Sequence, residues 1–137
     1  MSSPKHIVAC IGPTFDPASE EHRQLTAAGV TLRPISGRTE EDIIAGAQGA
    51  VGIFCFGLAP FTRRVFAALP DLRVLIQCTV GYDQVDVAAA TEHGVMVANS
   101  PRFCREEVSD HAAMLILACT RRLGPQLASL REHGWNR

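Results

Sequence analysis

The chain has 137 residues, a mass of 14.8 kDa and a formal net charge of −1. Its 47% hydrophobic and 20% charged residues are typical of one globular domain, or one domain and part of another, and exclude disordered or collagen-like chains. Because the charges balance and no basic block occurs, neither a nucleic-acid partner nor a polybasic membrane anchor is expected. The longest apolar stretch, residues 112–119, is too short to cross a bilayer. The five scattered cysteines form no Cys-x-x-Cys pair, so we expect reduced thiols, no metal site and a cytoplasmic location.

Five short apolar segments, rich in β-branched residues, are the predicted strands. In chain order they are residues 6–11, 30–35, 50–56, 73–78 and 95–98. The third and fourth are apolar along their length, which is typical of central strands covered on both faces. The helical segments between them have recognisable ends: 17–28 after Asp16 and before Gly29, Thr39 to Gly46 or Gly49, 62–69 before Pro70, and 86–93 before Gly94. This alternation predicts an α/β fold, a doubly wound, flavodoxin-like sheet of five parallel strands in the order 2-1-3-4-5.

The last third of the chain differs, because a long helical pattern runs from Glu106 to Leu123 without a strand. Residues 112–119 carry no polar side chain on any face of that helix. A helix that is apolar all round has to be buried all round, so we expect a second domain or a partner chain to cover it. Gly124-Pro125 is predicted to break the helix before a last amphipathic piece. We therefore divide the chain into a domain of residues 1–101 and a helical region of residues 102–137.

Two loops stand where a doubly wound sheet binds its ligands, beyond the carboxyl ends of the strands. Phe56, Gly57 and Leu58 follow the third strand, and Val80 and Gly81 follow the fourth. Gly81 allows close approach to the backbone, and consecutive amides in such a turn can hold a carboxylate. The same residues also fit an ordinary strand-to-helix turn in which Asp83 caps the helix, and the pattern alone favours that interpretation.

The chain contains no other pattern typical of a nucleotide or metal site. No Gly-x-Gly-x-x-Gly occurs, so tight binding of NAD to this chain alone is not expected. The five histidines show no metal-ligand spacing. Asp110 and His111 are neighbours on a helix and do not face each other, which makes a catalytic pair a poor interpretation.

Four segments carry a resemblance to a known family. They are Leu69-Pro-Asp-Leu-Arg-Val-Leu75, Val80-Gly-Tyr-Asp-Gln-Val-Asp86, Gly94-Val-Met-Val-Ala-Asn-Ser-Pro101 and the helix that starts with Glu106-Glu-Val-Ser-Asp-His-Ala112. Together they resemble the D-isomer-specific 2-hydroxyacid dehydrogenases, and the resemblance extends over nearly the whole chain. It implies an amino-terminal substrate-binding domain followed by a Rossmann domain that binds NAD or NADP.

The resemblance also implies roles for particular residues. The amides of Val80 and Gly81 would hold the carboxylate of a small 2-keto or 2-hydroxy acid, and the loop of Phe56, Gly57 and Leu58 would close over it. This reverses the preference for an ordinary turn. The family's catalytic Arg, Glu and His lie beyond the last residue of this chain, so no residue of the chain is expected to be catalytic.

The resemblance gives the helical region a role as well. The helix from Glu106 to Leu123 would form a homodimer interface and lead into the NAD-binding domain. Cys104 and Arg105 occupy positions that lie near the cofactor in the family, although their residue types differ from those usual there. Phe56-Gly57 stands where phosphoglycerate-type members carry polar or basic side chains, so a phosphorylated substrate is not expected.

The expected function is the substrate-binding portion of an NAD(P)-dependent D-2-hydroxyacid dehydrogenase. Such an enzyme transfers a hydride between nicotinamide and a 2-keto or 2-hydroxy acid, and this chain alone is expected to be inactive. The alternative is a non-catalytic, stand-alone oligomerisation or binding module derived from the same domain. The residues favour no particular acid and neither NAD nor NADP.

Overall fold

The computed structural model describes residues 6–13 and 16–135, which fall into two compact units divided after Pro101. The first unit is an α/β domain and the second is helical. The elements of the first are β1 (His6–Ile11), α1 (Glu20–Ala27), β2 (Val30–Ile35), α2 (Glu40–Gly46), β3 (Gly52–Cys55), α3 (Arg63–Ala68), β4 (Val74–Gln77), α4 (Val87–Glu92) and β5 (Met96–Asn99). Within the described residues, every helix is too short or too polar to span a membrane.

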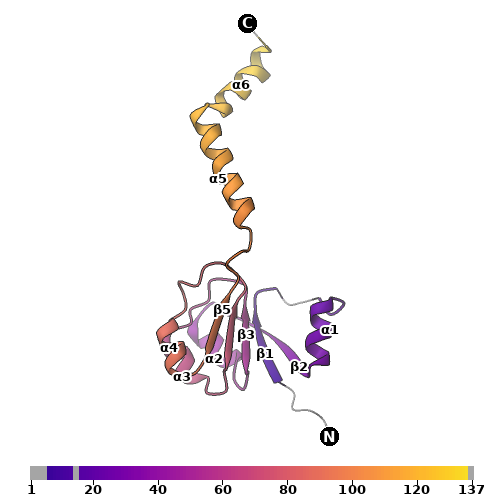
Figure 1. Ribbon diagram of the computed structural model, residues 1–137, viewed down its shortest axis with the longest axis vertical. Helices are drawn as coiled ribbons and strands as arrows, with labels where there is room; N and C mark the ends of the chain where they lie inside the picture. Colours follow the sequence, from indigo (N-terminus) through magenta and orange to yellow (C-terminus); the bar gives the residue numbers. More distant parts are fainter. Residues whose placement is uncertain (1–5, 14–15, 136–137) are drawn as a thin grey trace. The chain divides into compact units, whose positions relative to one another are not determined.

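The five strands form one parallel sheet in the order β2-β1-β3-β4-β5 (Figure 1). This confirms the predicted fold class and strand order. The chain moves from β1 outward to β2 and then returns to β3 on the other side of β1, so the direction of winding changes between β1 and β3. The carboxyl ends of neighbouring parallel strands meet at one edge, and ligands of such sheets bind there, near that change of direction.

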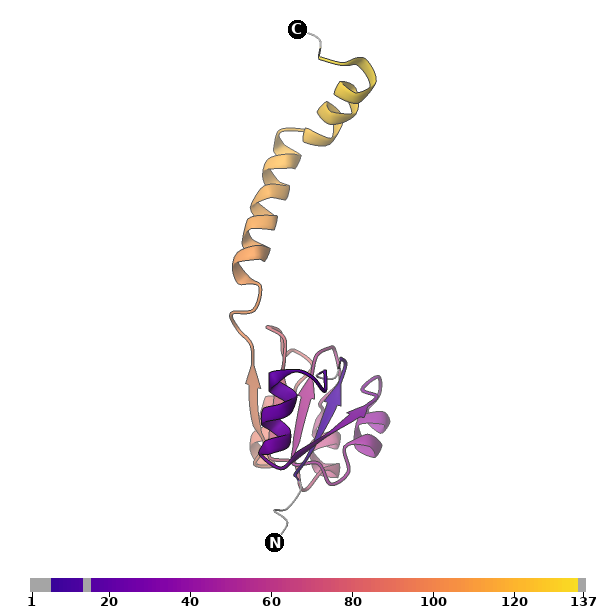
Figure 2. The same ribbon diagram turned by 90° about the vertical axis from the view of Figure 1, so that its right-hand side faces the viewer.

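Helices lie on both faces of the sheet. α2, α3 and α4 cover one face and α1 lies against the other (Figures 1 and 2). Polar contacts tie the three-helix layer together, because the Thr62 hydroxyl donates to Glu40 Oε1 at 2.9 Å and Arg63 pairs with Glu92 of α4.

The core lies between the sheet and the layer formed by α2, α3 and α4. Its largest fully buried apolar side chains are Phe61, Phe66, Ile43, Ile53, Leu72 and Leu75. On the opposite face of β3 and β4, Phe54, Val74 and Ile76 are only half-buried. β3 and β4 are thus inside the sheet, as predicted, but their second face is only partly covered. The physical reason is the position of α1. Among the described residues of the first unit, α1 is the helix on that face, and it packs near β2 and not over β3 and β4.

The first helix starts later than the sequence predicts. Asp16 caps a turn instead of the helix, since its carboxylate accepts from the Ala18 amide at 2.8 Å. Ser19 is the residue that caps α1, with its hydroxyl accepting from the His22 amide at 3.2 Å. Both residue types favour the N-cap position, and the one nearer the helical segment takes it.

The second unit contains α5 (Arg105–Thr120) and α6 (Leu123–His133). The predicted helix from Glu106 to Leu123 ends early, because Arg122 adopts a left-handed conformation with φ 52°. Gly124-Pro125 does not break a helix but lies in the first turn of α6, where proline is tolerated because its missing amide proton would have no partner. All the described side chains of α5 except Ala118 are exposed.

Candidate functional site

The structure brings the two predicted ligand loops together at the carboxyl edge of the sheet. The loop after β3 and the loop after β4 are joined by backbone hydrogen bonds, from Phe61 N to Gln84 O at 2.9 Å and from Asp86 N to Phe61 O at 2.8 Å. The buried Gln77 side chain adds a third link, since its Nε2 donates to Gly57 O at 2.8 Å. Residues 56–58 and residues 80–81 are therefore parts of one surface.

Hydrogen bonds fix the peptide groups on either side of Val80. The Thr79 carbonyl accepts from Ser100 N at 3.0 Å, and the Val80 carbonyl accepts from Asn99 Nδ2 at 2.8 Å. A trans peptide group is planar with its N–H opposite its C=O, and no described bond is cis. The N–H groups of Val80 and Gly81 therefore both point away from the residues at the end of β5. Within the described chain neither N–H has an acceptor, so the two amides can bind an anion together.

Gly81 and Asp83 do not have the roles of an ordinary capping turn. Asp86 caps α4, with its Oδ1 accepting from the Ala89 amide at 2.8 Å, so the capping role considered for Asp83 is wrong. Gly81 has no left-handed φ, and a methyl group on its Cα would meet only Asp83 Oδ2, at 3.7 Å. The glycine is thus not required to relieve strain, and it leaves open space beside the two amides.

The loop after β3 has one anchored residue and one exposed residue. Gly57 is anchored through its carbonyl, which accepts from Gln77 Nε2 and from the Cys55 thiol at 3.3 Å. Leu58 is 82% exposed. Phe56 is half-buried, and its amide donates to Ile11 O at 2.9 Å. An apolar side chain on a loop that is fixed at its base is able to cover a small ligand held by the neighbouring amides.

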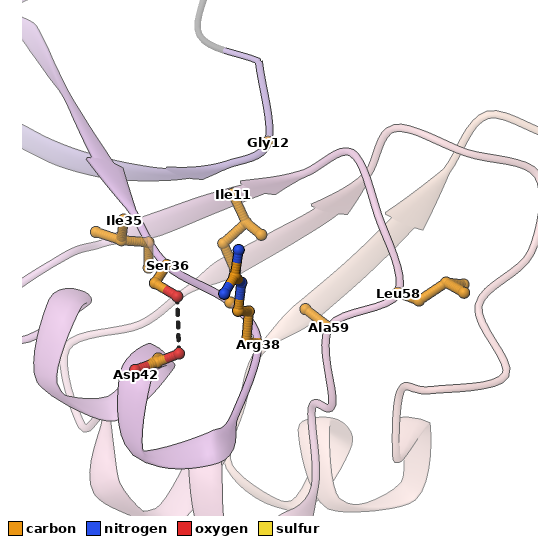
Figure 3. A pocket seen from close by; sticks show the side chains of 9 residues that line it. Ile11, Gly12, Ile35, Ser36, Arg38, Asp42, Leu58 and Ala59 are labelled. Carbon is orange, nitrogen blue, oxygen red and sulfur yellow. Dashed lines mark hydrogen bonds between the residues drawn. The ribbon is translucent and has the colours of Figure 1, made fainter.

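Leu58 and Ala59 of this loop also line a cleft of about 730 Å³ (Figure 3). Its lining comes from the carboxyl ends of β1 and β2, the loop after β2, the first turn of α2 and the loop after β3: Ile11, Gly12, Ile35, Ser36, Gly37, Arg38, Asp42, Leu58 and Ala59. Ser36 donates to Asp42 Oδ2 at 2.7 Å, and Arg38 has no ion pair with any described residue. Arg38 is therefore the one free cation of the lining, and sequence reasoning missed it because the cleft arises from the meeting of three loops.

Two thiols near this edge, those of Cys10 and Cys78, have raised pKa values. Burial raises the pKa of the Cys10 thiol, with a smaller contribution from Cys78. Burial also raises the pKa of Cys78, and Cys55 adds to that effect. A raised pKa keeps these thiols protonated near neutral pH, and the thiolate is the reactive form. Across residues 6–13 and 16–135, no three His, Cys, Asp or Glu side chains group to hold a metal ion.

Cys104 and Arg105 lie at the start of α5, in the second unit. Cys104 precedes the helix with φ 52°, and Arg105 is the first helical residue and is exposed. They belong to a different compact unit from Val80 and Gly81. Their proposed contact with a cofactor stays a prediction.

Comparison with known proteins gives one consistent family. Residues 13–130 match the model of the D-isomer specific 2-hydroxyacid dehydrogenase catalytic domain. A D-3-phosphoglycerate dehydrogenase from Mycobacterium tuberculosis is 35% identical over 108 residues, which cover 79% of this chain and 20% of that protein. A glyoxylate reductase from Korarchaeum cryptofilum is 40% identical over 76 residues, 56% of this chain and 23% of its own length. The chain thus spans about a fifth of the length of these curated relatives.

Solved structures agree in fold. A glyoxylate reductase from Paecilomyes thermophila superposes with a TM-score of 0.79 and 23% identity, over 97% of this chain and 43% of that one. An NADPH-dependent glyoxylate/hydroxypyruvate reductase from Sinorhizobium meliloti, solved with NADP and malonate, gives a TM-score of 0.69 and 27% identity. That match covers 96% of this chain and 39% of the reductase.

Proposed function

The chain belongs to the D-isomer specific 2-hydroxyacid dehydrogenase family, and on this basis we propose that residues 6–101 form the substrate-binding part of such an enzyme. The substrate is a small 2-keto or 2-hydroxy acid. Its carboxylate is held by the amides of Val80 and Gly81, and Leu58 covers it. The dehydrogenase acts in the cytoplasm, where the five free cysteines stay reduced.

The observation that carries this proposal is the pair of unpaired amides. Hydrogen bonds to a charged acceptor are stronger than those between neutral groups, and two N–H groups fixed on one side of a turn suit the two oxygens of a carboxylate. The carbonyls behind them are already held by Asn99 and Ser100. The amides are therefore oriented before the ligand arrives, which lowers the entropy cost of binding.

The lining of the loops favours a small, unphosphorylated acid. Phe56 and Leu58, on the loop proposed to cover the acid, are apolar and bring no Arg or Lys side chain to a phosphate group. The Sinorhizobium meliloti reductase was solved with malonate, itself a small carboxylate.

The cofactor of the family is NAD or NADP, and the residues described here do not fit it. A dinucleotide site needs a glycine-rich turn between a strand and a helix that cradles the phosphates. Such a turn is absent from residues 6–13 and 16–135, where each strand-to-helix loop of the first unit lacks the Gly-x-Gly-x-x-Gly pattern. We therefore assign no step of hydride transfer to this chain and expect it to be inactive alone. Oxidation of NADH with glyoxylate or hydroxypyruvate by the purified chain would contradict this.

Affinity for glycolate, the smallest 2-hydroxy acid, tests the carboxylate site. Gly81→Ala adds a methyl group beside the amides but meets little of the protein, so we expect unchanged thermal stability and an affinity lower by about tenfold or more. Gly124→Ala is the matched control, because a methyl group there meets nothing within 4 Å and lies in the other unit. Glycolamide, which lacks the charge, should not bind the unmodified chain. Equal affinity of the unmodified chain and Gly81→Ala for glycolate would contradict the proposal.

A further inference from the structure

Gln77 is the one polar side chain buried in the core among the described residues, at 1% exposure. It is the last residue of β4, directly below the loop that carries Val80 and Gly81. Its Nε2 donates to two acceptors on different loops, Gly57 O at 2.8 Å and Thr79 Oγ1 at 3.2 Å. The Thr79 hydroxyl then donates to Gly81 O at 3.0 Å. A continuous chain of hydrogen bonds thus leads from the loop after β3, through Gln77, to the turn of the two amides.

The orientation of the Gln77 amide is determined by these partners. Two acceptors face the nitrogen, so exchanging the nitrogen and the oxygen would set the amide oxygen against the Gly57 carbonyl. Within the described residues Oε1, on the other side of the amide, has no hydrogen-bond partner although it is buried. A buried polar atom without a partner opposes folding. Gln77 therefore contributes less to the stability of the fold than a fully satisfied side chain would.

We propose that Gln77 is a positioning residue for the carboxylate site, and that it acts by coupling the loop of Gly57 and Leu58 to the turn of Val80 and Gly81. Bonds in such a chain polarise and strengthen one another. Gln77 holds the Thr79 hydroxyl, and that hydroxyl fixes the carbonyl of Gly81. The same nitrogen holds the carbonyl of Gly57, which precedes Leu58. The position of Leu58 and the orientation of the two amides therefore depend on one chain of hydrogen bonds. The inference deepens the proposed function and rests on it for the identity of the ligand.

Methionine at position 77 separates this role from a structural one. Met has nearly the volume and flexibility of Gln, so Gln77→Met leaves no cavity. It also leaves few groups unpaired, because Gly57 O keeps its bond from Cys55 and the Thr79 hydroxyl keeps its bond to Gly81 O. We expect the thermal midpoint to stay the same or to rise. We also expect lower ¹⁵N order parameters at Gly57 and Gly81, and glycolate affinity lower by about threefold to tenfold.

Thr79 supplies the second link and a conservative rescue. Thr79→Val removes the hydroxyl at constant shape and should reduce glycolate affinity as Gln77→Met does, whereas Thr79→Ser keeps the hydroxyl and should restore it. Both residues belong to one chain of hydrogen bonds. The double variant Gln77→Met/Thr79→Val should therefore lose no more glycolate affinity than the single variant with the larger loss. Additive losses would show that the two residues act separately and would overturn the relay.

The outcomes separate this inference from the proposed function. If the unmodified chain binds glycolate and Gln77→Met binds it equally well, the relay is wrong and the carboxylate site stands. If the unmodified chain does not bind glycolate, the carboxylate site fails, and the order parameters of the ligand-free protein still decide the relay. Two results for Gln77→Met would overturn the relay. One is ¹⁵N order parameters that stay unchanged at both Gly57 and Gly81. The other is a clear fall in the thermal midpoint without a lower order parameter at either glycine.

Discussion

Gly37 marks the closest approach of the loop after β2 to β1. A methyl group on its Cα would lie 2.9 Å from Ile11 Cδ1 and 3.1 Å from Ile11 Cγ1, well inside normal contact. Ile11 is 8% exposed and β-branched, so it has little freedom to move. We expect Gly37→Ala to lower the free energy of unfolding by about 1–3 kcal/mol, as overpacking does elsewhere. Urea denaturation measures this change.

The control for that variant is Gly57→Ala. Gly57 has no left-handed φ, and an added methyl group would meet nothing within 4 Å. The free energy of unfolding of Gly57→Ala should differ from that of the unmodified chain by less than about 0.5 kcal/mol. A loss at position 57 equal to that at position 37 would contradict the described packing.

Single residues also show where sequence reasoning reached the site and where it did not. Val80 and Gly81 could be identified because a glycine follows an apolar strand at the ligand-binding edge. Gln77 gave no signal, since one polar residue in an apolar segment resembles many exposed strand positions and its partner Gly57 is 20 residues away. Arg38 was missed for the same reason, because its cleft depends on contacts between distant loops.

At the scale of elements, the stability of α4 depends on which residue is its N-cap, Asp86 or Asp83. Asp86 Oδ1 accepts from the Ala89 amide, whereas the Asp83 carboxylate does not cap the helix. Loss of an N-cap carboxylate costs about 0.5–2 kcal/mol. We expect Asp86→Ala to lower the free energy of unfolding by that amount and Asp83→Ala to leave it nearly unchanged. The reverse result, in chemical denaturation of both variants, would restore the turn in which Asp83 is the cap.

Ion pairs in the layer of α2, α3 and α4 are expected to make the stability of the fold depend on pH. Hydrogen bonds from Arg63 lower the pKa of Glu92, and hydrogen bonds from Arg64 lower the pKa of Glu41. A carboxylate whose pKa is lower in the folded state stabilises the fold above its unfolded pKa, and this contribution disappears as the pH falls through the folded pKa. At neutral pH, Glu92→Gln should therefore melt at a slightly lower temperature than the unmodified chain.

The difference should vanish in acid and shrink in high salt, because the pair is exposed and screened. Asp71→Asn is the control, since Asp71 is exposed and no described residue pairs with it. Thermal melts at several pH values measure both variants. A difference that persists unchanged in acid would exclude the Arg63–Glu92 pair as its cause.

The positions of the strands were predictable because side-chain periodicity determines them. The ends of the helices were less predictable because more than one residue could act as the cap. The strands β1 and β2 lie at the predicted residues, and β3, β4 and β5 differ by one to two residues at their ends. Ser19 and Asp16 are both good caps, and the local sequence does not rank them. Gly124-Pro125 fits either the end or the start of a helix, and the left-handed Arg122 just before it determines the outcome.

At the scale of the whole molecule, the exposed surface of α5 is the feature that the single chain leaves unexplained. Met114, Leu115, Ile116 and Leu117 are between 48% and 64% exposed. Apolar patches of this kind commonly mark an interface. We propose that α5 forms the interface of a homodimer, as the family resemblance implies. Sedimentation velocity should then show a species of twice the chain mass, and Ile116→Glu should convert it to a monomer with unchanged helix content.

The control for the dimer is Glu107→Lys, a charged position of the same helix, which should leave the dimer intact. A monomer at all concentrations of the unmodified chain would exclude this interface. Such a monomer would also weaken the alternative interpretation of the chain as an oligomerisation module. The carboxylate site would be unaffected, since it lies in the other unit.

The most direct test of the central claim is to map where a 2-hydroxy acid binds on the whole chain. Titration of the ¹⁵N-labelled protein with glycolate at constant ionic strength, followed by amide chemical shifts, gives this map. We predict saturable shifts at Val80 and Gly81, with smaller shifts at Gly57 and Leu58, and none with glycolamide. Shifts confined to α5 and α6, or shifts of equal size with glycolamide, would contradict a carboxylate site at the end of β4.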